Sequence, residues 1–223
     1  MPLGCLPLLF FLWIAFLIPV FFMDALLTAM AKLGFSVETA VFLVFWIFMG
    51  GLINIPVKRL EREEMIDFSP VSFFGLNRLY PKTYQRSYTI IAVNVGGCLI
   101  PTAIALYEWM RLGRLGGYAI FAALLAVLVN VVVCYRFARP LSGIGIALPP
   151  FLPALTAVLC AWLLLPGFAA PVAFIAGVMG PLIGADLLHL KDISRISTGI
   201  GSIGGAGTFD GIVLSGLFAV LLA

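Results

Sequence analysis

Long, uninterrupted apolar runs constrain the fold of this chain more than any single motif. Of its 223 residues, 63% are hydrophobic and only 10% are charged, and the mean hydropathy is +1.17. This composition is typical of an integral membrane protein. The runs are continuous and do not alternate with period two, which excludes a transmembrane β-barrel and leaves helices to cross the bilayer.

The pattern predicts an all-α integral membrane protein with about seven transmembrane helices in one domain, residues 1–223. The expected spans are 5–23, 38–55, 88–109, 116–135, 150–166, 170–189 and 206–223. The stretch 140–155 contains four prolines and two glycines. Because proline breaks helices and glycine permits unusual backbone angles, we expect a broken or re-entrant segment before the fifth helix.

The distribution of positive charge predicts the orientation. Ten Lys and Arg residues lie in loops that follow even-numbered spans, against three, Lys32, Arg111 and Arg114, in the other loops. Cytoplasmic loops carry the excess, so we expect a prokaryotic cell-membrane protein with its N-terminus inside and its C-terminus outside. This bias accounts for the net charge of +3, so membrane lipid is an expected partner and nucleic acid is not.

The segment 56–87 is the only sizeable stretch expected outside the membrane. Its first part, VKRLEREEMIDF, mixes charges of both signs and predicts a solvated helix end. Its second part, VSFFGLNRLYPKTY, places aromatic residues beside basic ones, as in a helix that lies on anionic headgroups. We therefore expect a cytoplasmic or interfacial loop here, with substrate docking or gating as the alternative.

Two aspartates lie in apolar, glycine-rich stretches at the end of the sixth span and the start of the seventh. Asp186 lies in LIGADLLHL and Asp210 in SIGGAGTFDGI. Carboxylates in such surroundings are costly and mark functional sites. A short polar turn between the spans predicts that the two acids face each other on the cytoplasmic side, so residues 140–223 form the expected active-site half.

Such a pair has a defined chemistry. Two close carboxylates share one proton, so the ionised member can take a proton from water while the protonated member polarises a carbonyl group. Flanking glycines, Gly205, Gly207 and Gly211, leave room for an extended substrate backbone. The pattern predicts an aspartyl-type protease that cleaves membrane-embedded peptides and needs no cofactor.

These residues resemble the GxGD intramembrane aspartyl proteases, the presenilin and signal-peptide-peptidase group. In that group the catalytic aspartates lie on consecutive helices joined on the cytoplasmic side, a glycine pair precedes the second aspartate, and a Pro-Ala-Leu motif borders the site. The resemblance implies a catalytic role for Asp186 and Asp210. It also implies that the substrate is bound by the motif residues Pro153, Ala154 and Leu155.

The chain departs from that group at three places. Thr208 and Phe209 separate the glycine pair from Asp210, Ala185 replaces a tyrosine, and the Pro-Ala-Leu motif precedes the aspartates. Over its whole length the chain resembles a prokaryotic family of multi-pass membrane proteins with no assigned function.

Other interpretations of the same acids remain open. Asp186 and His189 lie three residues apart on one helix face, and with Asp210 they could bind a divalent cation. The aspartates could instead relay protons or sodium ions in a transporter. Asp210 could also cap the seventh helix, where a carboxylate meets free N–H groups.

Asn130 and Glu108 are also polar residues within the spans. Asn130 is expected to form hydrogen bonds with a neighbouring helix, as single amides do in membrane bundles. Glu108 lies near a span end beside Arg111, so we expect it to be solvated.

Overall fold

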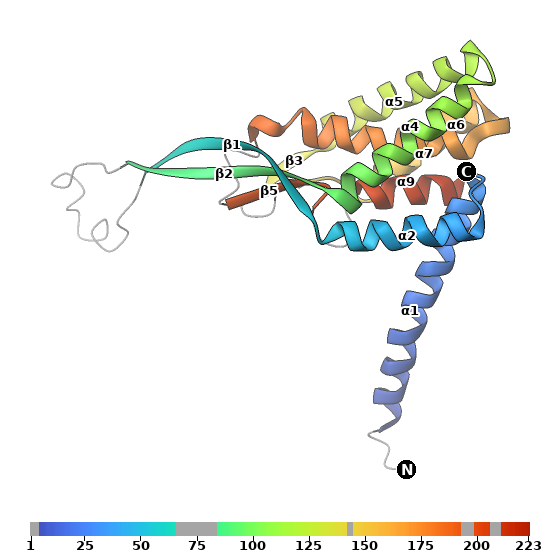
Figure 1. The fold of residues 1–223 in the computed structure, drawn as a ribbon, viewed down its shortest axis with the longest axis horizontal. Helices are drawn as coiled ribbons and strands as arrows, with labels where there is room; N and C mark the ends of the chain where they lie inside the picture. Colours follow the sequence, from blue (N-terminus) through green and yellow to red (C-terminus); the bar gives the residue numbers. More distant parts are fainter. Residues whose placement is uncertain (1–4, 66–83, 142–144, 193–198, 206–210) are drawn as a thin grey trace.

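The computed structural model describes residues 5–65, 84–141, 145–192, 199–205 and 211–223. The molecule is a helical bundle from which a narrow β-ribbon extends at one end (Figure 1). Its main helices are α1 (Cys5–Lys32), α2 (Val37–Gly51), α4 (Ile100–Gly113), α5 (Gly117–Phe137), α6 (Leu152–Leu164), α7 (Ala169–Gly180) and α9 (Gly211–Leu222).

A helix overlaps each of the predicted spans. The shorter helical segments are the π-helices η2 (Val95–Leu99) and η4 (Pro181–Leu187) and the 3₁₀ turn η3 (Pro166–Phe168). Within the described part of the chain, two helical stretches are long and apolar enough to cross a membrane, Gly117–Phe137 and Pro166–Leu187. The helical positions are thus confirmed at a coarse level.

The interior of the bundle is rich in alanine, although it also holds large side chains such as Phe174 and Met30, and many large apolar residues lie on its outside. Helix α7 is central and packs against α4, α5, α6 and α9. The residues without solvent exposure include Ala122, Ala123, Ala126, Ala157, Ala161, Ala173 and Ala176. Leu128, Val132 and Trp162 are more than half exposed, and Leu163 is 82% exposed. Close helix packing through small residues is characteristic of helices in lipid.

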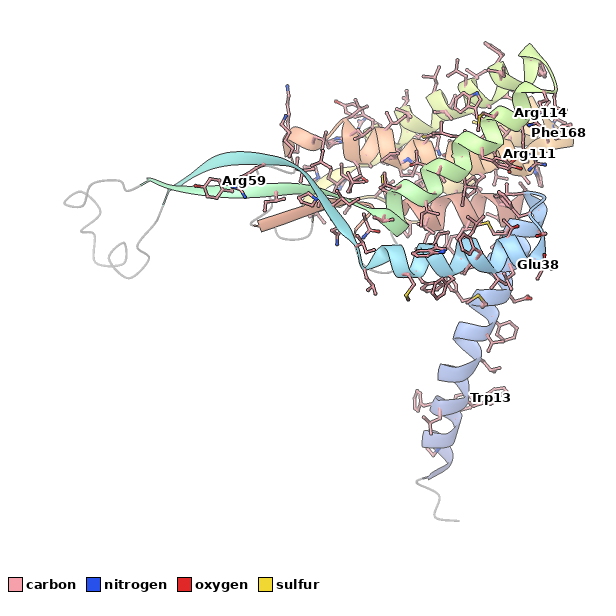
Figure 2. All side chains as sticks on the ribbon, viewed as in Figure 1. Trp13, Glu38, Arg59, Arg111, Arg114 and Phe168 are labelled. Carbon is pink, nitrogen blue, oxygen red and sulfur yellow. The ribbon has the colours of Figure 1, made fainter. Side chains whose placement is uncertain are left out.

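Helix α1 joins this bundle only through its last turns. Leu26, Ala29, Met30 and Leu33 are buried, whereas Phe10 and Trp13 are exposed, and Trp13 lies where the helix points away from the bundle (Figure 2). Among the described residues, α1 therefore contributes fully buried side chains to the core only from Leu26 onward.

The structure also contains β-strands, so the all-α prediction is wrong in this respect. Strand β1 (Asn54–Met65) pairs antiparallel with β2 (Tyr84–Asn94), and β5 (Gly199–Ile203) pairs parallel with β2, in the order β1-β2-β5. The segment 56–65 is thus a strand and not a helix end, and the predicted span 88–109 begins as a strand. The predicted interfacial helix lies mostly in 66–83, outside the described residues.

The Pro/Gly-rich stretch before α6 is broken, as predicted. Strands β3 (Arg139–Leu141) and β4 (Gly145–Ala147) form a small antiparallel hairpin, and α6 starts at Leu152 after a turn through the prolines. Re-entry of this segment into a membrane stays a prediction.

Candidate functional site

Asp186 lies on η4, the π-helical continuation of α7, in a half-buried position. Gly184 brings this turn against α5, because a Cβ atom there would lie 2.4 Å from the Val131 carbonyl oxygen and 2.9 Å from the Cys134 Cβ. Asp186 acts electrostatically on the Cys134 thiol, so the carboxylate also lies near α5. Single-turn π-bulges occur frequently at functional sites.

His189 folds back onto the turn that carries Asp186. Its Nδ1 atom lies 3.0 Å from the Ala185 carbonyl oxygen and 3.2 Å from that of Gly184. Both partners only accept hydrogen bonds, so Nδ1 carries the proton and Nε2 is the acceptor in the neutral ring. The ring also lies 4.9 Å from the Tyr135 ring on α5, which holds the imidazole against that helix.

The metal-site alternative is only partly described by the structure. Asp186 and His189 are one turn apart, but no group of three or more potential metal ligands forms among the described residues. Asp210, the third expected ligand, lies outside those residues, as does Gly207.

The connection between Asp186 and α9 is more than the short polar turn predicted. It contains β5, which runs beside β2 in the sheet, before the chain reaches Gly205. Gly211, exposed, is the first residue of α9. Asp186 therefore lies in a helix–strand–helix unit formed by η4, β5 and α9, in which the strand belongs to the sheet (Figure 1).

A polar junction formed by Asn54, Asn94 and Ser202 anchors β5 to the start of the helices. The Asn94 amide donates to the Gly51 carbonyl at 2.8 Å and to Asn54 Oδ1 at 3.1 Å, and Asn54 Oδ1 also accepts from the Ser202 hydroxyl. Asn94 Oδ1 in turn accepts from the Gly97 amide at 2.7 Å. The hydrogen bonds of the buried Asn94 amide are thereby satisfied, and the exposed Asn54 links this amide to β5.

Two glycine contacts make this junction tight. A Cβ on Gly97 would lie 1.9 Å from the Gly204 carbonyl oxygen, and Gly204 adopts a φ of +71°. A Cβ on Gly205 would lie 1.9 Å from Ser202 Oγ. Gly205 is thus closely packed against the chain's own residues, a role that differs from the predicted clearance for substrate.

The Pro-Ala-Leu segment opens α6 and packs against α5. Pro153 and Ala154 are buried, whereas Leu155 is 52% exposed. The Asn130 amide of α5 donates to the Pro153 carbonyl at 3.1 Å and to the Ala176 carbonyl at 2.8 Å. This confirms Asn130 as an interhelical bridge. It also places the segment against α5 one turn before Cys134, the residue near Asp186.

The sequence interpretation missed a buried acid at the other end of the bundle. Glu108 is 1% exposed, and both its carboxylate oxygens accept from Arg111 Nη1, at 2.8 and 3.1 Å. The prediction that Glu108 is solvated is therefore wrong. The i+3 spacing to Arg111 signals the ion pair in the sequence, but it carries no signal that Glu108 is buried.

These features define a class of predominantly helical protein with an alanine-rich core, an apolar exterior and a half-buried aspartate on a π-helical turn. The chain belongs to the family described as protein of unknown function (DUF1614), whose model matches residues 48–222. No curated protein matches the chain, and no solved structure does. The family match agrees with the resemblance to a family without assigned function and adds no support for the protease resemblance.

Proposed function

We propose that this protein is a membrane-embedded aspartyl protease that uses Asp186 and Asp210. Embedding is supported by the many large apolar side chains exposed on the outside of a core that is rich in alanine. An apolar surface this extensive is unfavourable in water and favourable in lipid. The two long apolar helical stretches supply spans of about the required length.

The contact between α9 and η4 carries the proposal. Helix α9 starts at the residue that follows Asp210 in the sequence, and α9 contacts η4, which carries Asp186. Helices α7 and α9 run antiparallel in the bundle (Figure 1), with Gly177 packed against Gly216. The start of α9 and the end of α7 are thereby at the same end of the bundle, as a two-aspartate site requires.

The proposed reaction is hydrolysis of a peptide bond by one activated water. The ionised aspartate takes a proton from the water, whose oxygen attacks the substrate carbonyl, while the protonated aspartate donates a hydrogen bond to the carbonyl oxygen. A proton is then transferred to the leaving nitrogen as the C–N bond breaks. The half-buried setting of Asp186 favours sharing of one proton, because two close carboxylates with little water resist double ionisation.

Strand β5 offers a place for an extended substrate. It is an edge strand, since among the described strands it pairs only with β2. A peptide added along its free edge would gain main-chain hydrogen bonds, the mode of recognition called β-augmentation. Gly199 and Gly201 on this strand have no side chains to obstruct that approach.

Cleavage of a reconstituted substrate tests the proposal. Wild-type protein in liposomes is incubated with a fluorogenic transmembrane peptide, beside Asp186→Asn, Asp210→Asn and the control Asp24→Asn, which changes an exposed carboxylate on α1. We expect each site variant to lose activity by at least about hundredfold, the usual contribution of a general acid or base. The control should cleave like wild type, and undiminished cleavage in both site variants would disprove the proposal.

Proton- or cation-coupled transport is the second candidate. It is favoured by Glu108, which gives the bundle a buried carboxylate at the end opposite η4 (Figure 2 labels its partner Arg111). Ionisable groups inside a membrane bundle mark ion and proton pathways, and such a pathway would run between these two ends. Proton flux into liposomes without peptide, lost in Asp186→Asn and in Glu108→Gln, would favour transport over proteolysis.

A further inference from the structure

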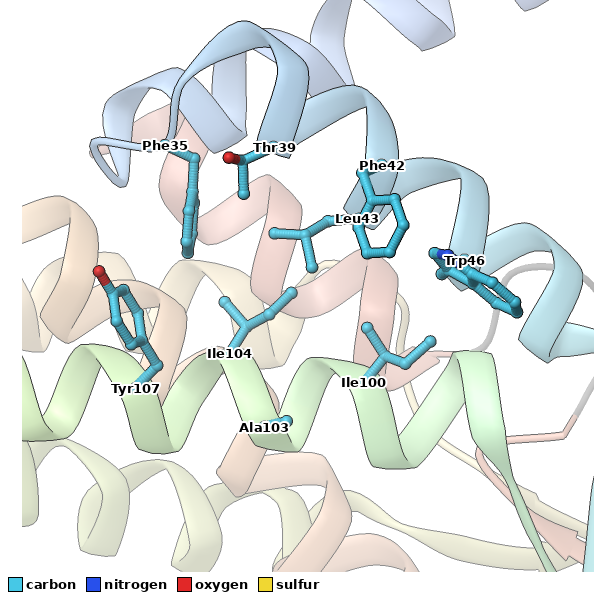
Figure 3. Close-up of a pocket in the computed structure, with 9 residues that line it drawn as sticks. All are labelled: Phe35, Thr39, Phe42, Leu43, Trp46, Ile100, Ala103, Ile104 and Tyr107. Carbon is cyan, nitrogen blue, oxygen red and sulfur yellow. The ribbon is translucent and has the colours of Figure 1, made fainter.

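An apolar groove lies on the outer face of the bundle between α2 and α4. Figure 3 shows the side chains of both helices converging on it from opposite sides. Its volume is about 480 Å³, within the usual range for small-ligand pockets. The lining residues that matter here are Phe42, Leu43 and Trp46 from α2 and Ile100, Ala103 and Ile104 from α4.

One end of the groove is aromatic and leads to a cation. Phe35 and Tyr107 stack there with ring centroids 5.5 Å apart, and both line the groove. The Arg111 guanidinium carbon lies 5.8 Å from the centre of the Tyr107 ring. The guanidinium also lies against Gly34, since a Cβ on that glycine would be 3.1 Å from Arg111 Nη2. The apolar groove is therefore continuous with a positively charged end.

Two polar cavities meet at the same arginine. The first, of about 390 Å³, is lined by Lys32, Gly34, Arg111 and the first residues of α7. The second, of about 220 Å³, is lined by Arg111, Arg114 and Phe168. Figure 2 shows Arg111, Arg114 and Phe168 gathered at one end of the bundle, far from Arg59 on the sheet. We call Lys32, Arg111 and Arg114 the cationic rim.

The hydrogen bonds that the cationic rim makes within the protein leave N–H donors for a ligand. Arg111 donates to Glu108 and to the Leu33 carbonyl through Nη1 alone, and no described residue accepts a hydrogen bond from its Nη2 or Nε. Lys32 donates to the carbonyl oxygens of Val220 and Leu221, at 3.3 and 2.8 Å, which leaves one of its three protons. Phosphate oxygens are strong acceptors for both side chains, because arginine can bind them with two parallel hydrogen bonds and lysine as a point charge.

We propose that the groove and the cationic rim together bind one anionic phospholipid. An acyl chain lies in the groove between Trp46 and Tyr107, and the phosphate accepts hydrogen bonds from Arg111, with Lys32 and Arg114 adding positive charge. A groove that is apolar along its length and cationic at one end matches an amphiphile with one charged head. A transmembrane helix of a partner protein would fill the apolar part and leave the rim without its counter-charge.

Lipid titration followed by native mass spectrometry tests this inference. Intact protein in detergent is titrated separately with phosphatidylglycerol, which is anionic, and phosphatidylcholine, which is zwitterionic. Ala103→Trp fills the groove from α4 without changing any charge, and Arg114→Gln removes one cation of the rim. Leu106→Trp is the matched control, because Leu106 is 51% exposed on the same helix and does not line the groove.

Wild-type protein should bind one phosphatidylglycerol about tenfold more tightly than phosphatidylcholine, as expected when basic side chains face an anionic headgroup. Ala103→Trp should weaken this binding by about tenfold, and Leu106→Trp should leave it unchanged. Arg114→Gln should weaken binding of phosphatidylglycerol by about fivefold, with no effect on phosphatidylcholine. Thermal melting confirms that each variant is folded.

Equal binding of the two lipids would overturn the proposal, as would wild-type affinity in folded Ala103→Trp. A photo-crosslinker in place of Trp46 adds an independent measurement in liposomes. Crosslinks to phospholipid support the proposal, whereas crosslinks only to a protein helix would contradict it.

Discussion

Arg111 Nη1 donates to both carboxylate oxygens of Glu108, but the two side chains differ sharply in burial, at 40% and 1% exposed. Removing either partner therefore has a different consequence. Without Arg111, the carboxylate stays buried and unpaired. Without Glu108, the guanidinium can turn toward the polar cavities that it lines.

We expect Arg111→Gln to destabilise the protein by about 3 kcal/mol, because a buried charge loses its partner. Glu108→Gln should cost only about 1 kcal/mol, since its amide oxygen still accepts from Arg111. Thermal and denaturant unfolding in detergent measures both losses. Arg114→Gln is the control for Arg111→Gln, because it removes the same positive charge. Equal losses in the two variants would show that the buried carboxylate is not what makes the pair important.

Gly97→Ala should be among the most destabilising single changes. The new Cβ would lie 1.9 Å from the Gly204 carbonyl oxygen, and backbone cannot move aside as a side chain does. We expect a loss of about 3 kcal/mol, the upper end of overpacking costs. Gly117→Ala is the matched control, because nothing lies within 4 Å of its added Cβ, and it should be neutral or slightly stabilising.

Metal removal distinguishes the aspartate pair from a metal site. If the protease proposal is right, cleavage should persist after exhaustive chelation and in His189→Gln, since no step uses His189. Cleavage rates with and without chelator, followed by metal re-addition, measure this. Loss of activity on chelation that zinc or magnesium restores would instead favour a cation held by Asp186, His189 and Asp210.

The orientation expected from the positive charges can be measured with single cysteines. Arg59→Cys lies on β1 and Arg114→Cys in the turn after α4, at opposite ends of the molecule (Figure 2), and both side chains are exposed. A membrane-impermeant maleimide added to intact cells should label position 114 and not position 59. The unmodified protein controls for its own cysteines, of which Cys98 and Cys134 are buried. The reverse labelling pattern would invert the topology.

The helices were predictable because each is a long apolar run, and length with composition largely determines such elements. Strand β1 was not, because KRLEREEM is charged and its ladder is formed with a partner some 30 residues later. Strand β2 did carry a signal: TIIAV is rich in β-branched residues, yet its apolar character also suits the start of a membrane span.

The candidate site was predictable in its residue types and not in its contacts. The cost of an aspartate in an apolar stretch singles out Asp186 from composition alone. Its approach to α5 depends on Gly184 meeting the Val131 carbonyl, which pairs residues more than fifty positions apart. Likewise, the bond from Asn130 to Pro153 follows from how three helices pack, and no local pattern encodes it.

The π-helical turn at 181–187 has a consequence for how this chain tolerates insertions and deletions. A π-helical turn is an α-helical turn with one residue too many, so the helix could lose one residue there and close as a regular α-helix. Every later side chain on the same helix would then rotate by about 100°, the angle between successive residues. Asp186 would then point away from Cys134, although the helix would still begin and end at the same places in the fold. The extra residue therefore sets the direction of the carboxylate.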